Sequence, residues 1–260
     1  MTHPTLAEVL GQALGGIAGK RVLHVCTAEG GFIHALVEHL ESYARIIGID
    51  ASLDAVRTAQ CALDHEDIGF IHMDAECLAF RDESLDTVNL SFSLHHLADA
   101  PRVLGEMKRV LVPGGHAIIS EMHRDGQTEA QLVAARIHQW AAEVDRALGT
   151  VHRRTHTHQE IVDHVDALDL CDVALYEFID VDSDPSDAAA IEGVRGYIDR
   201  FMLRLRGAST DRALAQRGEE LRRQLYQVGF QREPVLVVVG KKAYPRTQIA
   251  ARSPGSSGPL

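Results

Sequence analysis

Residues 22–32 read Val-Leu-His-Val-Cys-Thr-Ala-Glu-Gly-Gly-Phe, and this stretch decides the fold. A short β-branched run passes through small residues into an amphipathic segment, which is typical of the strand, loop and helix that open a nucleotide-binding βαβ unit. Asp50 follows 20 residues after Gly30, at the end of the next predicted strand. An acidic residue at about this spacing binds the ribose hydroxyls in such units, and a turn or helix-capping role for Asp50 is the alternative.

The loop after the first strand indicates which kind of nucleotide binds there. A dinucleotide site needs the pattern G-x-G-x-x-G, because the pyrophosphate lies on the helix N-terminus and the third glycine permits close helix–strand packing. Cys26, Ala28 and His34 break this pattern, and Glu29 places a carboxylate where phosphates would bind. A cofactor with a positive charge and no phosphate fits the loop better, so a nicotinamide-dependent oxidoreductase is disfavoured.

The chain from Lys20 to Glu121 predicts an α/β fold with a doubly wound, mostly parallel, Rossmann-like sheet. Short β-branched runs alternate there with segments whose apolar residues recur at helical spacing. Pro113 with Gly114 and Gly115 is expected to end the last of these helices and turn the chain into a strand. The predicted strands are 21–25, 45–49, 68–72, 87–91 and 116–121, and the predicted helices are 32–40, 53–63 and 100–110.

After Glu121 the pattern becomes mainly helical. Thr157 and Glu160 form a capping-box pattern that opens one of these helices. Helices are predicted at 127–148, 158–168, 185–205 and 211–228, and strands at 172–181 and 235–240. We therefore expect a cofactor-binding core at 1–122, a helical lid or substrate elaboration with one sheet strand at 123–229, a terminal strand returning to the core sheet at 230–242 and a disordered tail at 243–260. The elaboration is expected to pack over the carboxyl edge of the sheet and not to form an independent domain.

Composition limits the partners and the compartment. The chain has 260 residues, of which 37 are acidic and 26 basic, and its formal net charge is −11, so a phosphate backbone would be repelled and nucleic acid is not an expected substrate. The four cysteines form no C-x-x-C pair, which favours a reducing cytoplasm. Apolar runs stay below the roughly 18 residues that a membrane span needs. The oligomeric state is left open.

Five stretches, taken together and in order, resemble the small-molecule class I methyltransferases, the group that includes the ubiquinone and menaquinone methyltransferases. They are residues 22–32, 47–52 (Ile-Gly-Ile-Asp-Ala-Ser), 70–88, 91–97 (Ser-Phe-Ser-Leu-His-His-Leu) and 106–115 (Glu-Met-Lys-Arg-Val-Leu-Val-Pro-Gly-Gly). The resemblance covers about Gly19 to Glu121. It implies a Rossmann-like methyltransferase fold, S-adenosylmethionine as cofactor and methyl transfer to a small molecule whose identity, and whose methylated atom, stay open.

The resemblance also implies roles for particular residues. Glu29, Gly30 and Gly31 would line the methionine and ribose side, Asp50 would bind the ribose, Ala51, Asp74 and Ala75 would hold the adenine, and Ser91 would touch the methionine portion. The chain departs from the family at His24, where an acid is usual, and at Cys26 and Ala28, where glycines are usual. A Cβ at the last two positions limits positive φ angles. These departures favour, as the alternative function, a non-catalytic member that binds S-adenosylmethionine or another nucleoside.

Histidines are frequent near the expected methyl group, and 15 occur in the chain. Imidazole titrates near neutral pH, so a histidine is a candidate general base. His123 is the first candidate, because it ends the fifth predicted strand beside Glu121, whose carboxylate would raise its pKa; His96 is the second. No H-E-x-x-H motif occurs, and these histidines are interpreted as hydrogen-bonded or exposed side chains, with no metal site expected.

Overall fold

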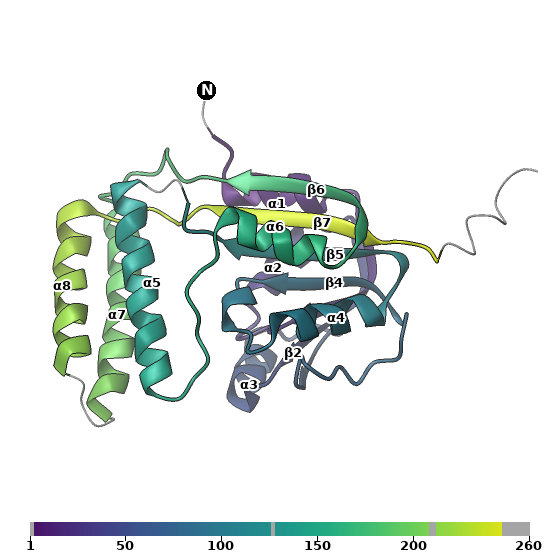
Figure 1. Ribbon diagram of the computed structural model, residues 1–260, viewed down its shortest axis with the longest axis horizontal. Coiled ribbons are helices and arrows are strands. Elements are labelled where there is room, and N and C mark those ends of the chain that lie inside the picture. The colour runs from purple at the N-terminus through teal and green to yellow at the C-terminus, as the bar shows by residue number, and fades with distance from the viewer. Residues whose placement is uncertain (1–2, 126–127, 208–211, 246–260) are drawn as a thin grey trace, which may run out of the picture.

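The computed structural model describes residues 3–125, 128–207 and 212–245. Within them seven strands form one sheet in the order β3-β2-β1-β4-β5-β7-β6 (Figure 1). The neighbours from β3 to β5 pair in parallel, while β7 pairs antiparallel with β5 and β6, so the predicted doubly wound, mostly parallel sheet is confirmed. The strands are β1 (Ala18–Val25), β2 (Ser42–Asp50), β3 (Ile68–His72), β4 (Leu85–Ser91), β5 (Leu111–Met122), β6 (Leu170–Phe178) and β7 (Val235–Lys242).

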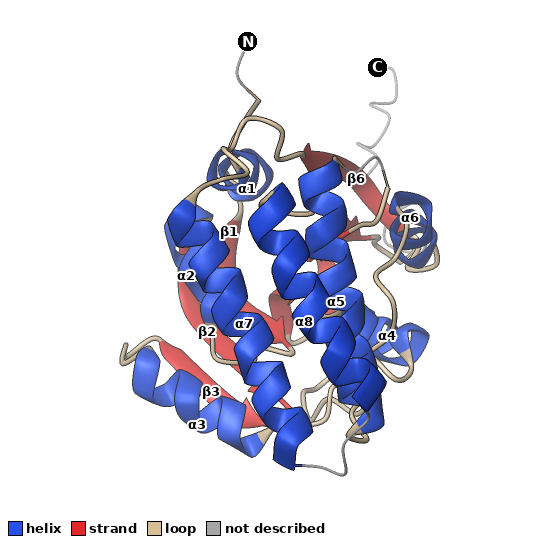
Figure 2. Cartoon of the chain, turned by 90° about the vertical axis from the view of Figure 1, so that its left-hand side faces the viewer, coloured by secondary structure: helices blue, strands red, loops and turns tan. Residues whose placement is uncertain are grey.

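Helices cover both faces of this sheet because both faces of its central strands are apolar. One face packs against α1 (Leu6–Leu14), α2 (Gly31–His39) and α3 (Leu53–Ala62). The other packs against α4 (Ala100–Val110) and α6 (His158–Asp166). Figure 2 shows the two groups of helices on opposite sides of the strands. This arrangement leaves the carboxyl ends of the parallel strands as the open edge, where doubly wound folds bind ligands.

Three further helices form a bundle beyond this carboxyl edge (Figures 1 and 2). They are α5 (Glu129–Ala147), α7 (Ala188–Gly207) and α8 (Arg212–Val228), and they enclose a hydrophobic cluster of their own around Trp140. Helix α6, which the sequence grouped with them, instead places Ile161 and Val165 in the cluster that covers the sheet. The loop between α5 and α6, residues 148–157, therefore connects the bundle to the core.

Two local predictions need correction. The chain does not turn between α4 and a separate strand at His116, because β5 begins directly at Leu111 and contains Pro113–Gly115 as an irregularity in its register with β4. Helix α1 was not expected, although Thr5 and Glu8 form a capping box at its start. The predicted disordered tail, 243–260, lies outside the described residues from 246 onward.

No helix in the described part of the chain is both long and apolar enough to cross a membrane.

Candidate functional site

The loop between β1 and α2 adopts a conformation that glycine normally supplies. Cys26 and Ala28 have φ angles of 54° and 47°, and Gly30, the N-cap of α2, has 83°. For a residue with a Cβ this left-handed backbone costs roughly 1–2 kcal/mol. The sequence suggested that a Cβ would keep the chain out of this conformation, whereas the chain adopts it with the Cβ atoms present.

Asp50 holds this loop against the end of β2. Its Oδ2 accepts a hydrogen bond from the Ala28 amide at 2.8 Å, and its Oδ1 accepts one from the Ser52 amide at 2.8 Å. Each carboxylate oxygen has a second lone pair, so both can still accept a hydroxyl. Asp50 therefore fixes the loop, and both of its oxygens can still accept a hydrogen bond from another donor.

Asp50 lies on a cavity of about 200 Å³ at the carboxyl edge of β1, β2 and β3. Several residues that the sequence assigned to the cofactor, and one assigned to catalysis, line it together: Asp50, Ala51, Asp74, Ala75 and His96. Its walls also contain Cys26 from the first loop and Val151 from the loop between α5 and α6. The volume is below the range of about 300–1,000 Å³ of drug-sized ligand sites, so it suits part of a nucleoside ligand whose remainder lies outside it.

Other predicted cofactor residues do not line this cavity. Glu29 and Gly31 are exposed beside it on the first loop, while Gly30 is buried and a Cβ on it would lie 2.8 Å from Leu63. Ser91 is buried at the end of β4, where its hydroxyl donates to Asn89 Oδ1 at 3.0 Å. Asp74 also makes a local turn, because its Oδ1 accepts from the Glu76 amide at 2.9 Å.

His24 replaces the family's acid with a neutral ring. It is buried, its Nδ1 lies 2.9 Å from Thr27 Oγ1, and it stacks on Phe32 with ring centroids 5.7 Å apart. Burial lowers its pKa to about 3. The base of the loop therefore carries no charge near neutral pH.

His123, the first candidate base, lies apart from the cavity. The strand β5 ends at Met122, and the His123 Nε2 is 3.2 Å from Glu177 Oε1 of β6, with the His158 ring beside it. Burial lowers the pKa of His123, and the nearby carboxylate of Glu177 opposes that shift. The expected pairing with Glu121 is therefore wrong. His123 does not line the cavity that contains Asp50, although its chain neighbours Met122 and Arg124 line two other cavities, and a catalytic role for His123 stays a prediction.

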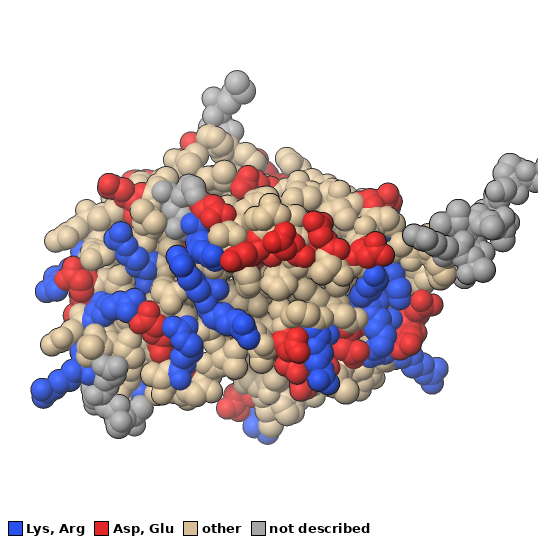
Figure 3. All heavy atoms as spheres, viewed as in Figure 1, with Lys and Arg blue, Asp and Glu red and all other residues tan. Residues whose placement is uncertain are grey.

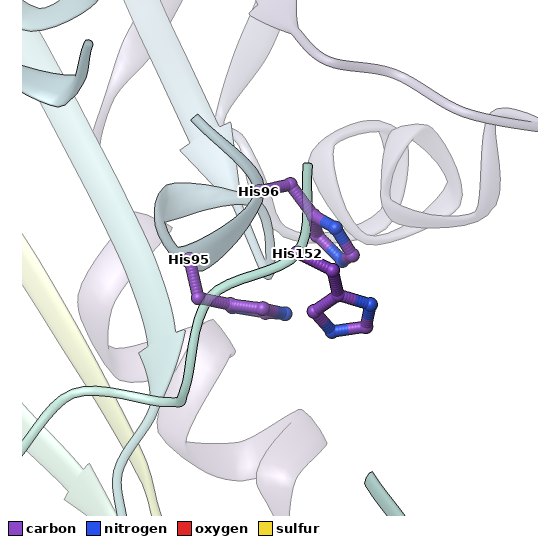
Figure 4. A group of neighbouring side chains, drawn as sticks. All are labelled: His95, His96 and His152. Atoms are coloured by element: carbon purple, nitrogen blue, oxygen red, sulfur yellow. The ribbon is translucent and has the colours of Figure 1, made fainter. Parts of the chain in front are cut away.

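Glu121 instead faces a cluster of histidines. Its Oε1 lies 3.1 Å from His95 Nδ1, and its two oxygens also accept from the amides of Leu94 and Met122, at 2.7 and 3.0 Å. Burial raises the pKa of Glu121, and burial together with nearby imidazoles lowers that of His95. The rings of His96 and His152 face His95 in Figure 4. This cluster is not predictable from the sequence, where its only signal is the high frequency of histidine.

A second cavity, of about 470 Å³, lies on the other side of the cluster, between the bundle and the sheet. Its lining is mainly apolar, with charged groups at Arg200, Arg232 and Glu233. His138 and Met122 lie on its wall. Its volume falls within the range of small-molecule sites.

Basic side chains also gather, although the chain as a whole is acidic. Arg124, Arg136, Arg154 and Arg217 line a cavity of about 440 Å³ beside α5, and Figure 3 shows basic side chains collected over this part of the surface. Two of them are paired with acids, Arg124 with Glu160 and Arg217 with Glu143. The folded chain thus brings together arginines that are dispersed in the sequence.

Comparisons with known proteins agree with the fold and the loop. Residues 23–119 match the family model described as a methyltransferase domain. The chain is 33% identical over 111 residues to the demethylmenaquinone methyltransferase of Clavibacter sepedonicus, covering 42% of this chain and 44% of that protein. It is 30% identical over 155 residues to phthiotriol/phenolphthiotriol dimycocerosates methyltransferase 1 of Mycobacterium ulcerans, covering 56% of each.

A solved structure shows the same fold over most of the chain. Phosphoethanolamine N-methyltransferase 2 of Haemonchus contortus, in complex with phosphomonomethylethanolamine and S-adenosylhomocysteine, matches with a TM-score of 0.56 at 14% identity, over 91% of this chain and 52% of that one. The chain spans about half the length of the curated relatives it matches. Residues 23–119 therefore match a methyltransferase domain, and the sheet around them has the fold of solved methyltransferase structures.

Proposed function

We propose that this chain transfers a methyl group from S-adenosylmethionine to a small-molecule acceptor. The observation that carries the proposal is the cavity at the carboxyl edge of β1–β3, where Asp50, Ala51, Asp74 and Ala75 lie together in one wall. Asp50 would accept the ribose hydroxyls, and Asp74 with the Ala75 amide would hold the adenine. The methionine portion would extend toward Glu29–Gly31 and Ser91.

The second cavity supports an acceptor with an apolar body. Tyr197 and Phe230 offer ring surfaces there, and Arg200 and Arg232 offer positive charge. A hydroxylated ring such as a naphthoquinol, suggested by the name of the Clavibacter relative, combines these features. S-adenosylmethionine supplies an activated methyl group on sulfur, so the chain's own work is to align the acceptor, exclude water and take up one proton. His96, on the wall of the cofactor cavity, is the better placed base, and His123 is the less favoured one.

The compartment that we propose is the cytoplasm, because Cys61, Cys77 and Cys171 are free and exposed thiols. We propose no nucleic-acid partner, because the net charge is −11 and two of the arginines beside α5 are paired with acids.

Calorimetry with S-adenosylmethionine and S-adenosylhomocysteine tests the cofactor. Methyl transfer from labelled cofactor to a panel of naphthoquinols, phenols and thiols tests the reaction. Saturable binding of both nucleosides with transfer to one acceptor class is expected. The strained loop at Cys26 and Ala28 favours a second candidate function, a protein that binds the nucleoside without turnover. Nucleoside binding with no methyl transfer to any acceptor in the panel or in cell extract would support this second candidate.

A further inference from the structure

Histidines from separate parts of the chain meet between the two cavities. His95 and His96 follow β4, His138 lies on α5 and His152 lies in the loop before α6. One ring nitrogen from each of His95, His96 and His152 lies within 4.8 Å of the others, and Figure 4 shows the three rings converging. His96 lines the first cavity and His138 the second, so the cluster separates the two.

The Nδ1 atoms of His95, His138 and His152 face carboxylates. A metal-binding histidine commonly donates its second ring N–H to a carboxylate, which orients the ring and directs the other nitrogen's lone pair at the ion. Each carboxylate here is almost fully buried. The three Nδ1-to-oxygen pairs are His95–Glu121 at 3.1 Å, His152–Asp145 at 2.7 Å and His138–Glu233 at 3.5 Å.

The inner nitrogen of His95 lacks a partner. Both oxygens of Glu121 accept hydrogen bonds from backbone amides, so Glu121 acts as an acceptor. It also accepts the N–H of His95 Nδ1, which leaves His95 Nε2 without a proton and with a free lone pair. That Nε2 is buried without a hydrogen-bond partner, and the residue is 1% exposed. A buried polar atom without a partner destabilises the folded chain unless a ligand satisfies it.

The inner nitrogens of His138 and His152 face each other. Their Nε2 atoms are 2.9 Å apart, while both Nδ1 atoms are directed at carboxylates. Because Asp145 takes the Nδ1 proton of His152, the Nε2 of His152 carries a lone pair, which accepts a hydrogen bond from His138 Nε2. Arg204 neutralises part of the charge on Asp145, at 2.7 Å, and Glu121 and Glu233 are further buried acids around the rings. A cation at the centre would use the lone pairs of His95 and His152 and offset the negative charge of the acids.

We propose that His95, His96 and His152 bind a divalent transition-metal ion of the Zn²⁺ type, with Glu121 and Asp145 as positioning residues. Three imidazole ligands suit such ions, and three protein ligands leave a fourth position open for water or a substrate atom. This site revises the sequence-based expectation of no metal. Its test measures ion binding and does not depend on methyl transfer, although the site shares His96 with the proposed reaction. An ion-bound His96 cannot also serve as the base.

Titration of metal-free, tag-free protein with Zn²⁺ and with Co²⁺ tests the proposal. We expect one tightly bound equivalent, a raised Tm and the intense visible absorption of four-coordinate Co²⁺. His96→Gln and His152→Gln are expected to lower the affinity at least 100-fold. Glu121→Gln is expected to lower it about 10–100-fold with the Co²⁺ absorption retained, as for other outer partners. His34→Ala, at an exposed position on α2, is the matched control and keeps wild-type binding.

Circular dichroism establishes that each variant folds, and His96 is chosen because its ring is exposed, so its replacement disturbs the core least. Equal Zn²⁺ affinity in His34→Ala, His96→Gln and His152→Gln would overturn the site. Binding of S-adenosylhomocysteine, measured on the same samples, separates the two proposals. Nucleoside binding without metal binding refutes only the metal site, and metal binding without nucleoside binding refutes only the cofactor assignment.

Discussion

Replacing Asp50 with alanine tests whether one carboxylate both fixes the first loop and binds the cofactor. The change removes two charge-assisted hydrogen bonds, each 2.8 Å long, from the amides of Ala28 and Ser52. A hydrogen bond to a charged group contributes about 1.5–3 kcal/mol, but both amides belong to exposed residues that water can reach. We therefore expect the free energy of unfolding to fall by about 1–3 kcal/mol in all, which lowers Tm by about 2–4 °C for each kcal/mol.

The same change should weaken cofactor binding by an amount similar to its effect on the fold. Loss of the ribose partner is expected to cost about 1.5–3 kcal/mol, which raises the Kd for S-adenosylmethionine about 10- to 150-fold. Calorimetry on the folded variant measures the Kd, and differential scanning calorimetry measures the Tm. Asp64→Ala, an exposed acid just after α3, is the matched control and should change neither. An unchanged Kd for Asp50→Ala would remove Asp50 from the site and refute the ribose assignment.

The remaining predictions concern single groups. Burial and the charges of Asp50 and Asp74 raise the pKa of Cys26 to about 12. Iodoacetamide at pH 8 should therefore alkylate the exposed Cys61, Cys77 and Cys171 well before Cys26, as measured by peptide mass spectrometry. Early labelling of Cys26 would contradict the raised pKa. Folding lowers the pKa of His24 from an ordinary 6.5 to about 3, so between these pH values the unfolded chain binds one proton more than the folded chain. The free energy of unfolding therefore falls by up to about 1.4 kcal/mol for each pH unit below 6.5, and this loss ends near pH 3. Urea unfolding of His24→Gln between pH 6.5 and 4 should have a shallower pH slope by this amount, and an equal slope counts against a neutral buried His24. Gly218→Ala places a Cβ 2.6 Å from the Trp140 ring, so thermal unfolding should show the bundle destabilised by ~1–3 kcal/mol. The control Gly105→Ala lies on an open face of α4 and should stabilise the chain by up to ~1 kcal/mol. Equal effects of the two changes would show that the bundle is loosely packed.

The sequence predicted the parts of the fold that depend on local pattern. The spacing between Gly30 and Asp50 placed an acid at the end of β2, and the structure has it on the cavity wall. Thr157 and Glu160 were expected to open a helix, and they form the capping box of α6. These features are encoded within a few residues, so neighbouring side chains suffice to read them.

The side-chain pairing at the end of β5 was not predictable in the same way. Alternation places Glu121 and His123 on one face, and the structure agrees, because Glu121 and Glu177 both pair with Leu236 of β7 and His123 contacts Glu177. Each side chain nevertheless takes its partner from a distant segment, His95 for Glu121 and Glu177 for His123. A strand pattern predicts which face a side chain is on, but not which segment packs against it.

The histidine cluster depends on tertiary structure alone. His152 and His156 are four residues apart, a spacing that puts two ligands on one face of a helix, yet they lie in the extended loop between α5 and α6 and only His152 joins the cluster. The same loop contributes Val151 to the cofactor cavity, and Arg153 of this loop donates its amide to the His95 carbonyl at 2.8 Å. A ligand in the cavity beside Val151 and an ion bound to His152 would therefore both contact the loop between α5 and α6. If an ion fixes His152, it also fixes Val151, so Zn²⁺ should tighten S-adenosylhomocysteine binding and the nucleoside should tighten Zn²⁺ binding by the same factor.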